Sequence, residues 1–502
     1  MMARWRQAIS DERLRQAGWL VDEATRLSIA GRRDEAAETG ERGLRMVRDV
    51  ARWAPGEALP LLARATADQS WYLAGLGRHS AALELAEEAL SLARAAHDVP
   101  LLARALIAAA DRLLESGRAQ ESLARSRELI ELPRLRSDTW LADGLATLSM
   151  SLAETGQHEE AYQISEQALR MWQTLAAEQP SLAVHSVYGR ILLNHANRLY
   201  LIGRWTEAAE TATQTIAFYR EMPGVDGLVR LQKLALALGN CSIILSRIRR
   251  HDEASAMSTE AVAISRILVA AQSGHRAQLA SGLRSHGGRL AALGQAEQSV
   301  EVLAEAVAIY RELAAEERSS YLSKLAEAVS DLATASDTEN ATALAEEAVD
   351  LRRELVAGNR AVHLPGLALS LSILADKQGA AGRLAAALQT GDESVRLIRE
   401  AAEANRAGVL PRYAFLVQEQ TERLDRAGRA AEALALGEEA IGVARQALGT
   451  HRAAGLGGLA DALLAQARRL TAGPGRNKAN KRRARELSRQ ADRLRTERNA
   501  MD

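Results

Sequence analysis

The sequence has a single cysteine, Cys241, and aromatic side chains make up only 3% of its 502 residues. One cysteine can form no internal disulfide and too few thiolates for a cysteine zinc site, so a reducing compartment fits the chain. Few aromatics disfavour a large sheet, which prefers β-branched and aromatic side chains. The abundance of Ala and Leu favours helices that pack closely through small side chains.

The chain also lacks net charge, because 64 Lys and Arg residues balance 64 Asp and Glu residues. A neutral chain has no overall attraction for nucleic acid or for an anionic membrane surface. No apolar run reaches about 18 residues, so no membrane span is expected. The residues from Met1 to Gln7 lack the apolar core of a signal peptide. We therefore expect a cytoplasmic protein without membrane contact.

What the sequence does contain is an internal repeat, marked by a Gly-Arg or Gly-Gln step with an Ala five residues on. The step recurs at intervals of 39 to 47 residues, and Arg249 and Ser336 fill the same slot in two copies. Each step predicts a turn between two helices, because glycine adopts the positive φ that ends a helix. The predicted turns lie near residues 31, 77, 117, 156, 203, 249, 294, 336, 382, 428 and 475.

Other positions repeat in phase with these turns. A Leu stands four residues before the turn in nine of eleven copies, small residues recur seven before and twelve after, and an aliphatic residue recurs thirteen after. Small residues at this spacing let two antiparallel helices approach each other. The aliphatic residues form the buried stripe of each helix. Eight of the nine prolines stand between one expected hairpin and the next, where helices should end and begin.

The skeleton of small residue, Leu, Gly and Ala, as in Ala196, Leu199, Gly203 and Ala208, resembles that of tetratricopeptide repeat proteins. The units exceed the 34 residues of that repeat, and in this they are similar to kinesin light chains and to long actinomycete arrays. The resemblance implies an all-α, right-handed superhelical solenoid of about eleven repeats whose first helices line a concave groove. Residues 1–475 would form the array, and residues 476–502 a basic capping helix of the same solenoid.

No motif combines a nucleophile with a base, cradles a phosphate or has metal-ligand spacing, so we predict no catalytic residue, metal or cofactor. We predict an interaction scaffold, adaptor or sensor that binds a peptide or another protein in its groove. The alternative is a regulatory subunit for a separately encoded signalling ATPase or protease, since similar arrays often accompany such enzymes. Nucleic-acid binding ranks lower, and the sequence leaves the oligomeric state open.

Polar residues that point away from both packing stripes gather on first helices in the middle of the array. They are Arg190, Asn194, Asn197 and Tyr200 in the fifth repeat, Asn240 in the sixth and Arg284 in the seventh. Asn amides can pair with the backbone of an extended peptide, and Arg can pair with a carboxylate. A solvated helix face has the same composition, so both interpretations stay open.

The end of the sequence is basic, with ten Lys and Arg residues against three acidic residues between Arg476 and Arg498. Candidates for contact with an acidic partner are Lys481, Arg482, Arg483 and Arg485. The alternative is a cap, because the outer face of a terminal helix must be polar to keep a solenoid soluble. No aromatic residue interleaves with these cations, which disfavours stacking on a single nucleic-acid strand.

Overall fold

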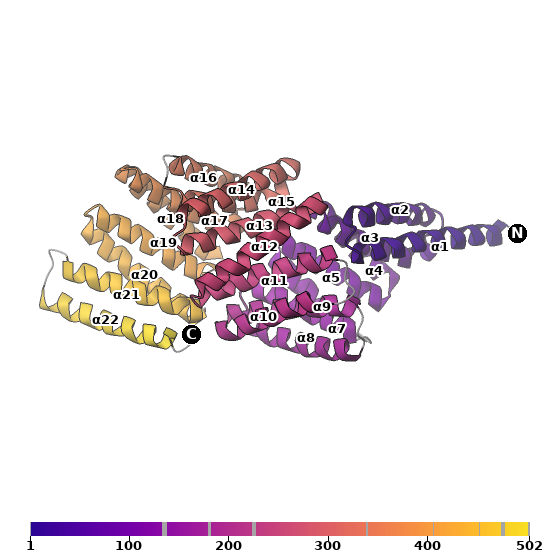
Figure 1. The fold of residues 1–502 in the computed structure, drawn as a ribbon, viewed down its shortest axis with the longest axis horizontal. Coiled ribbons are helices and arrows are strands. Elements are labelled where there is room, and N and C mark those ends of the chain that lie inside the picture. Colours follow the sequence, from indigo (N-terminus) through magenta and orange to yellow (C-terminus); the bar gives the residue numbers. More distant parts are fainter. Residues whose placement is uncertain are drawn as a thin grey trace. The chain divides into compact units, whose positions relative to one another are not determined.

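The computed structural model describes residues 2–132, 138–178, 182–222, 227–337, 340–404, 406–450, 452–472 and 477–499. Twenty-two α-helices and one 3₁₀-helix, Ser273–His275, occupy most of these residues, and no strand occurs among them. The α-helices alternate as first and second members of eleven hairpins (Figure 1). The predicted all-α array of helix-hairpin repeats is thereby confirmed.

The first helices are α1 (Met2–Ile29), α3 (Pro55–Gly75), α5 (Val99–Glu115), α7 (Asp138–Glu154), α9 (Leu182–Leu201), α11 (Gly227–Arg247), α13 (Arg276–Ala292), α15 (Arg318–Ala335), α17 (Arg360–Ala380), α19 (Arg406–Arg426) and α21 (Arg452–Ala472). The second helices are α2 (Arg33–Ala51), α4 (His79–Ala96), α6 (Ala119–Ile130), α8 (His158–Glu178), α10 (Trp205–Glu221), α12 (His251–Ala271), α14 (Ala296–Glu316), α16 (Ala341–Gly358), α18 (Leu384–Ala404), α20 (Ala430–Thr450) and α22 (Lys478–Asn499).

Most turns within the hairpins use the left-handed backbone conformation. Eight glycines there have φ between +73° and +87°, namely Gly31, Gly77, Gly117, Gly156, Gly203, Gly294, Gly382 and Gly428. Arg249 takes φ +62° in the sixth hairpin without being glycine. Ser336 differs, because it has φ −87° and ψ 130° and follows α15 as an extended residue. Gly475 lies outside the described residues.

The arginine that follows a turn pairs with a glutamate three residues further on. Four such pairs have one N–O distance between 2.6 and 2.7 Å, namely Arg32–Glu35, Arg118–Glu121, Arg250–Glu253 and Arg429–Glu432. The glutamate lies in the first turn of the second helix, where negative charge complements the helix dipole. The pairing therefore ties the residue after the turn to the second helix in these four hairpins.

Small residues lie at the helix crossings, as their spacing predicts. The alanines five residues after the turns are all at most 5% exposed, namely Ala36, Ala82, Ala161, Ala208, Ala254, Ala341, Ala387 and Ala433. The predicted position of the prolines is wrong in part, because Pro60, Pro365 and Pro411 lie inside first helices. Each is the sixth residue of its helix, so it removes only a hydrogen bond near the helix start.

The described helices belong to two compact units. Unit 1 comprises residues 1–199, 207–245 and 256–282, and unit 2 comprises residues 200–206, 246–255 and 283–502. Consecutive helices pack on each other from α1 to α8 and from α14 to α22, and first helices also pack on first helices, as α3 does on α5 and α19 does on α21. Each unit therefore has a face made by first helices alone.

Unit 1 contains a contact between hairpins far apart in the sequence. Gln272, just after α12, donates from Nε2 to the carbonyl oxygen of Gly31 at 3.0 Å. A Cβ atom added to Gly31 would lie only 2.8 Å from Cγ2 of Val229 on α11. The first and sixth hairpins therefore meet at the turn of the first.

Two described helices, α11 and α12, are long and apolar enough to cross a membrane, judged by length and composition. Core helices of proteins without membrane contact have the same properties. In α11 the apolar residues Leu238, Cys241 and Ile244 are buried inside the protein. The length and composition of these helices therefore carry little weight as evidence for a membrane span.

Candidate functional site

The structure ties two of the predicted groove residues on α9 to the preceding first helix, α7. Arg190 lies 3.4 Å, Nη2 to Oδ1, from Asp143. Asn194 donates from Nδ2 to the sulfur of Met150 at 3.4 Å. Burial raises the pKa of Asp143 while Arg190 opposes the rise. Arg190 and Asn194 therefore connect α9 to α7 of the preceding hairpin.

The other predicted groove residues are distributed over both units. Asn197 and Asn240 are half-buried in unit 1, and the side chain of neither makes a hydrogen bond within the described part of the chain. Tyr200 belongs to unit 2, as does Arg284, which pairs with Glu327 and, at 3.3 Å, with Asp331. Four of the six residues thus belong to unit 1 and two to unit 2, and their role in binding stays a prediction.

A buried Ser-His pair in unit 1 was not anticipated. The Oγ atom of Ser165 lies 2.8 Å from Nδ1 of His195, and the ring of Tyr162 stacks on the imidazole. Ser165 also donates its only hydroxyl proton to the carbonyl oxygen of Tyr162 at 2.8 Å. With the hydroxyl proton on that carbonyl, the imidazole tautomer protonated at Nδ1 donates to Ser165. The pair is a buried structural contact.

The first-helix face of unit 1 also holds charges at sites with little water. Burial raises the pKa of Asp111 on α5 to about 6, against the opposing effect of Arg112 and Arg190. Its Oδ1 atom is buried and accepts no hydrogen bond from the described residues. Burial likewise lowers the pKa of Lys233 on α11 to about 8. Such desolvated charges raise the cost of folding around pH 7.

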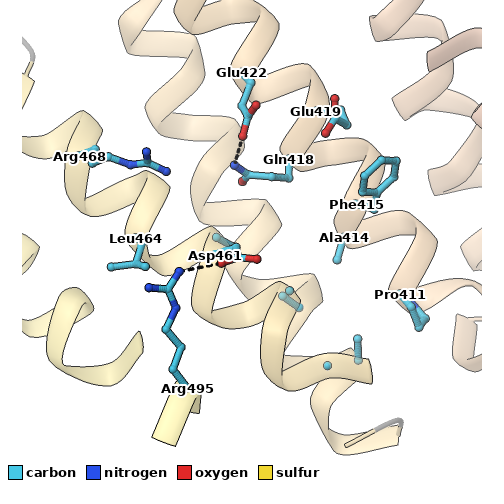
Figure 2. A pocket seen from close by; sticks show the side chains of 15 residues that line it. Pro411, Ala414, Phe415, Gln418, Glu419, Glu422, Asp461, Leu464, Arg468 and Arg495 are labelled. Atoms are coloured by element: carbon cyan, nitrogen blue, oxygen red, sulfur yellow. Dashed lines mark hydrogen bonds and ion pairs between the residues drawn. The ribbon is translucent and has the colours of Figure 1, made fainter. Parts of the chain in front are cut away.

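In unit 2, residues of α19, α20, α21 and α22 line a pocket of about 410 Å³, most of them from α19 and α21 (Figure 2). Phe415 on α19 stands at this pocket with 51% of its surface exposed. Glu419 and Glu422 line the same helix side, and Arg468 faces them from α21. The pocket therefore combines an exposed aromatic ring with charges of both signs.

Two polar contacts shape this pocket, and both are drawn in Figure 2. Gln418 donates to Glu422 at 3.1 Å, and Arg495 of α22 donates to Asp461 of α21 at 3.1 Å. Burial raises the pKa of Glu419, and the nearby carboxylate of Asp376 raises it further. A cation brought to Glu419 would relieve this destabilised negative charge.

Sequence reasoning missed Phe415, although a signal for it exists. Phe415 stands thirteen residues before the turn at Gly428, and Arg190 stands thirteen residues before Gly203. Phe415 therefore has the same position in its repeat as Arg190, a predicted groove residue, has in the fifth repeat. Phe415 is also one of only two phenylalanines in the chain, and large exposed aromatics are typical of binding surfaces.

The predicted basic residues all lie on α22, which packs through Ala484, Leu487 and Ala491. Arg483 pairs with Glu438 of α20 at 2.7 Å. Lys481, Arg482 and Arg485 are exposed, and none forms an ion pair with a described residue. Of the four predicted residues, Arg483 therefore connects α22 to α20, and the other three face solvent.

No family model matches the chain, and no curated protein matches it. Among solved structures, the chain is similar to a Rap protein complexed with Competence and Sporulation Factor, at 13% identity and a TM-score of 0.48, over 78% of this chain and 99% of that one. It is also similar to BtubC (BKLC) from P. vanneervenii, at 18% identity and a TM-score of 0.41, over 49% of this chain and 92% of that one.

A third similar structure is a signal transduction ATPase with numerous domains from Pyrococcus horikoshii, which has a tetratricopeptide repeat sensor. The identity is 12% and the TM-score 0.42, over 74% of this chain and 50% of that one. Likenesses at these identities and scores say nothing about function. The hairpins themselves have the turns and buried small residues that the repeat requires. In these features they resemble repeats of the tetratricopeptide type.

Proposed function

We propose that the chain is a protein-interaction module and that the pocket beside Phe415 binds a peptide segment of a partner protein. The observation that supports this most directly is the half-exposed Phe415 ring at a pocket of about 410 Å³. Covering such a ring on binding yields about 1–2 kcal/mol.

The charges around the pocket indicate which peptide it accepts. An apolar side chain would cover Phe415, and a neighbouring Lys or Arg would reach the carboxylates of Glu419 and Glu422. The raised pKa of Glu419 favours this pairing, because a bound cation stabilises the ionised carboxylate. The proposed ligand is therefore a segment with a hydrophobic residue beside a basic one.

Binding rather than catalysis is the proposed role of the whole chain. In the part of the chain that the structure describes, no group of three or more His, Cys, Asp or Glu residues could hold a metal ion. Such a module would act as a scaffold, adaptor or sensor, and control of a separately encoded enzyme is one use of it. The unit 1 residues Asn194 and Asn240 stay a second candidate set for the same role.

A random peptide library selected on the immobilised full chain tests the proposal. We expect the enriched peptides to place an aliphatic or aromatic residue beside Lys or Arg. Fluorescence anisotropy should show at least about tenfold weaker binding to Phe415→Ala, which is typical of an aromatic hot spot. Glu419→Gln should weaken the same peptides in a salt-dependent way.

The matched control is Val362→Ala, because Val362 is another exposed apolar residue of unit 2 that does not line the pocket. Binding should be unchanged by this control. Peptides that bind Phe415→Ala as well as the natural chain would contradict the proposed pocket. Peptides lost instead in Asn194→Ala and Asn240→Ala would assign binding to the first-helix face of unit 1.

A further inference from the structure

Consecutive second helices are linked by a regular series of ion pairs. In each, an arginine seventeen residues after one turn meets a glutamate eleven residues after the next. The N–O distances run from 2.6 to 2.8 Å in Arg48–Glu88, Arg94–Glu128, Arg220–Glu260, Arg311–Glu347 and Arg399–Glu439. In these five pairs, an arginine of one hairpin thus forms an ion pair with a glutamate of the next hairpin.

The hairpin of α21 and α22 has cations that form no such ion pair with a described residue. These two helices border an open groove of about 930 Å³. Its lining includes the small or apolar residues Leu464, Ala467 and Ala484. It also includes five cations, which are Arg468, Lys481, Arg485, Arg489 and Arg495. No carboxylate is among the described residues that line this groove.

Some cations of this hairpin form ion pairs, and others do not. Arg483 pairs with Glu438 of α20 at 2.7 Å, and Arg495, which lines the groove, pairs with Asp461 of α21 at 3.1 Å. Lys481, Arg485 and Arg489 make no ion pair with any described residue, although ion pairs are frequent elsewhere in the chain. These three unpaired cations line the groove, whereas Arg482 and Arg493 are unpaired and do not line it.

We propose that this groove binds an acidic amphipathic helix of a partner protein. Ala467 and Ala484 are buried between α21 and α22, and the partly buried Leu464 gives the groove an apolar side chain for the apolar stripe of that helix. Glutamates flanking the apolar stripe of that helix would pair with Lys481, Arg485 and Arg489. Charge complementarity of this kind sets the specificity and the association rate of an interface.

The test uses the full chain and a fluorescein-labelled designed helix with Leu and Ala along one face and Glu on both flanks. We expect Arg485→Glu with Arg489→Glu to weaken its binding at least about tenfold. The matched control is Arg482→Glu with Arg493→Glu, since these exposed cations of α22 do not line the groove. The control should change binding by less than about threefold, as expected for charges screened by salt.

A charge exchange gives a second readout. A peptide with every Glu replaced by Lys should bind the Arg485→Glu, Arg489→Glu chain better than the natural chain. Circular dichroism must show equal helicity for both variants. Equal binding of an unstructured polyglutamate peptide, or equal loss in the control variant, would overturn the proposal in favour of unspecific attraction.

Two further outcomes would assign the groove to another occupant and overturn the proposal. One is tighter binding of duplex DNA than of the acidic helix, abolished by the groove variant. The other is a dimer in multi-angle light scattering that the groove variant dissociates. Arg485 and Arg489 do not line the Phe415 pocket, so failure here leaves the library selection above unaffected.

Discussion

At the level of single residues, the turn of the sixth hairpin stands apart. Arg249 has φ +62°, a positive value that a glycine adopts in eight other turns. A side chain in this region places Cβ close to the following carbonyl oxygen, at a cost of roughly 1–2 kcal/mol. Nothing in the described structure requires an arginine there, so this turn stores avoidable strain.

Arg249→Gly should therefore stabilise the chain by about 0.5–1 kcal/mol, the strain relieved less the greater flexibility of glycine when unfolded. The midpoint of thermal unfolding, followed by circular dichroism, should rise. Ser336→Gly is the comparison, because Ser336 has negative φ and its Oγ donates to the carbonyl oxygen of Leu332 at 2.7 Å. That variant should lose stability, and a gain of equal size in both would contradict the explanation.

Asp111 should make stability depend on pH. Its pKa is about 6 in the folded chain against an ordinary 3.8. Between these values the folded state keeps a proton that the unfolded state has lost, so stability falls as pH rises from about 4 to about 6. Asp111→Asn should be more stable than the natural chain by about 1–2 kcal/mol at pH 7.5. Urea unfolding at several pH values should show this difference vanish near pH 4, and a constant difference would refute the assignment.

At the level of helices, a glutamine of one hairpin is inserted beside a glycine of the preceding second helix. The Nε2 atoms of Gln69, Gln420 and Gln466 donate to the carbonyl oxygens of Ala37, Leu388 and Leu434 at 3.0, 3.1 and 2.9 Å. Three residues after each carbonyl stands Gly40, Gly391 or Gly437, where an added Cβ would collide with the glutamine side chain. The missing side chain makes room for the bond between hairpins.

Two glycines of α20 test this contact within one helix. Gly437→Ala should destabilise the chain by about 1–3 kcal/mol, because the new methyl group displaces Gln466 from its site. Gly442→Ala meets nothing within 4 Å and should stabilise by about 0.5–1 kcal/mol through helix propensity. Urea unfolding of both variants gives the comparison, and equal effects would show that Gln466 tolerates the methyl group.

At the level of a whole unit, the contact of the first and sixth hairpins can be separated from turn strain. Gly31→Ala and Gly117→Ala both force a side chain to positive φ, but only the first collides with Val229. Each should cost about 1–2 kcal/mol from the backbone. Hydrogen exchange in residues 227–234 should accelerate only in Gly31→Ala. Equal acceleration in both variants would show that the contact contributes no protection.

The hairpins, their turns and their buried alanines could be predicted because they follow from spacing within one repeat. The residues at the Phe415 pocket could not be chosen from sequence, since every repeat offers the same offset and the pattern does not rank repeats. The contact of Gln272 with Gly31 spans 241 residues and leaves no local signal at either end. The division into two units depends on such long-range contacts and is equally invisible in the pattern.

The meeting of the first and sixth hairpins in unit 1 bears on how such a chain can evolve. Repeat arrays with contacts only between neighbours can gain or lose a hairpin by duplication or deletion and keep every other contact. In unit 1 an added hairpin would carry Val229 and Gln272 one repeat away from Gly31. Insertion or deletion of a hairpin between them would therefore break both contacts, whereas substitutions keep the spacing of the repeats.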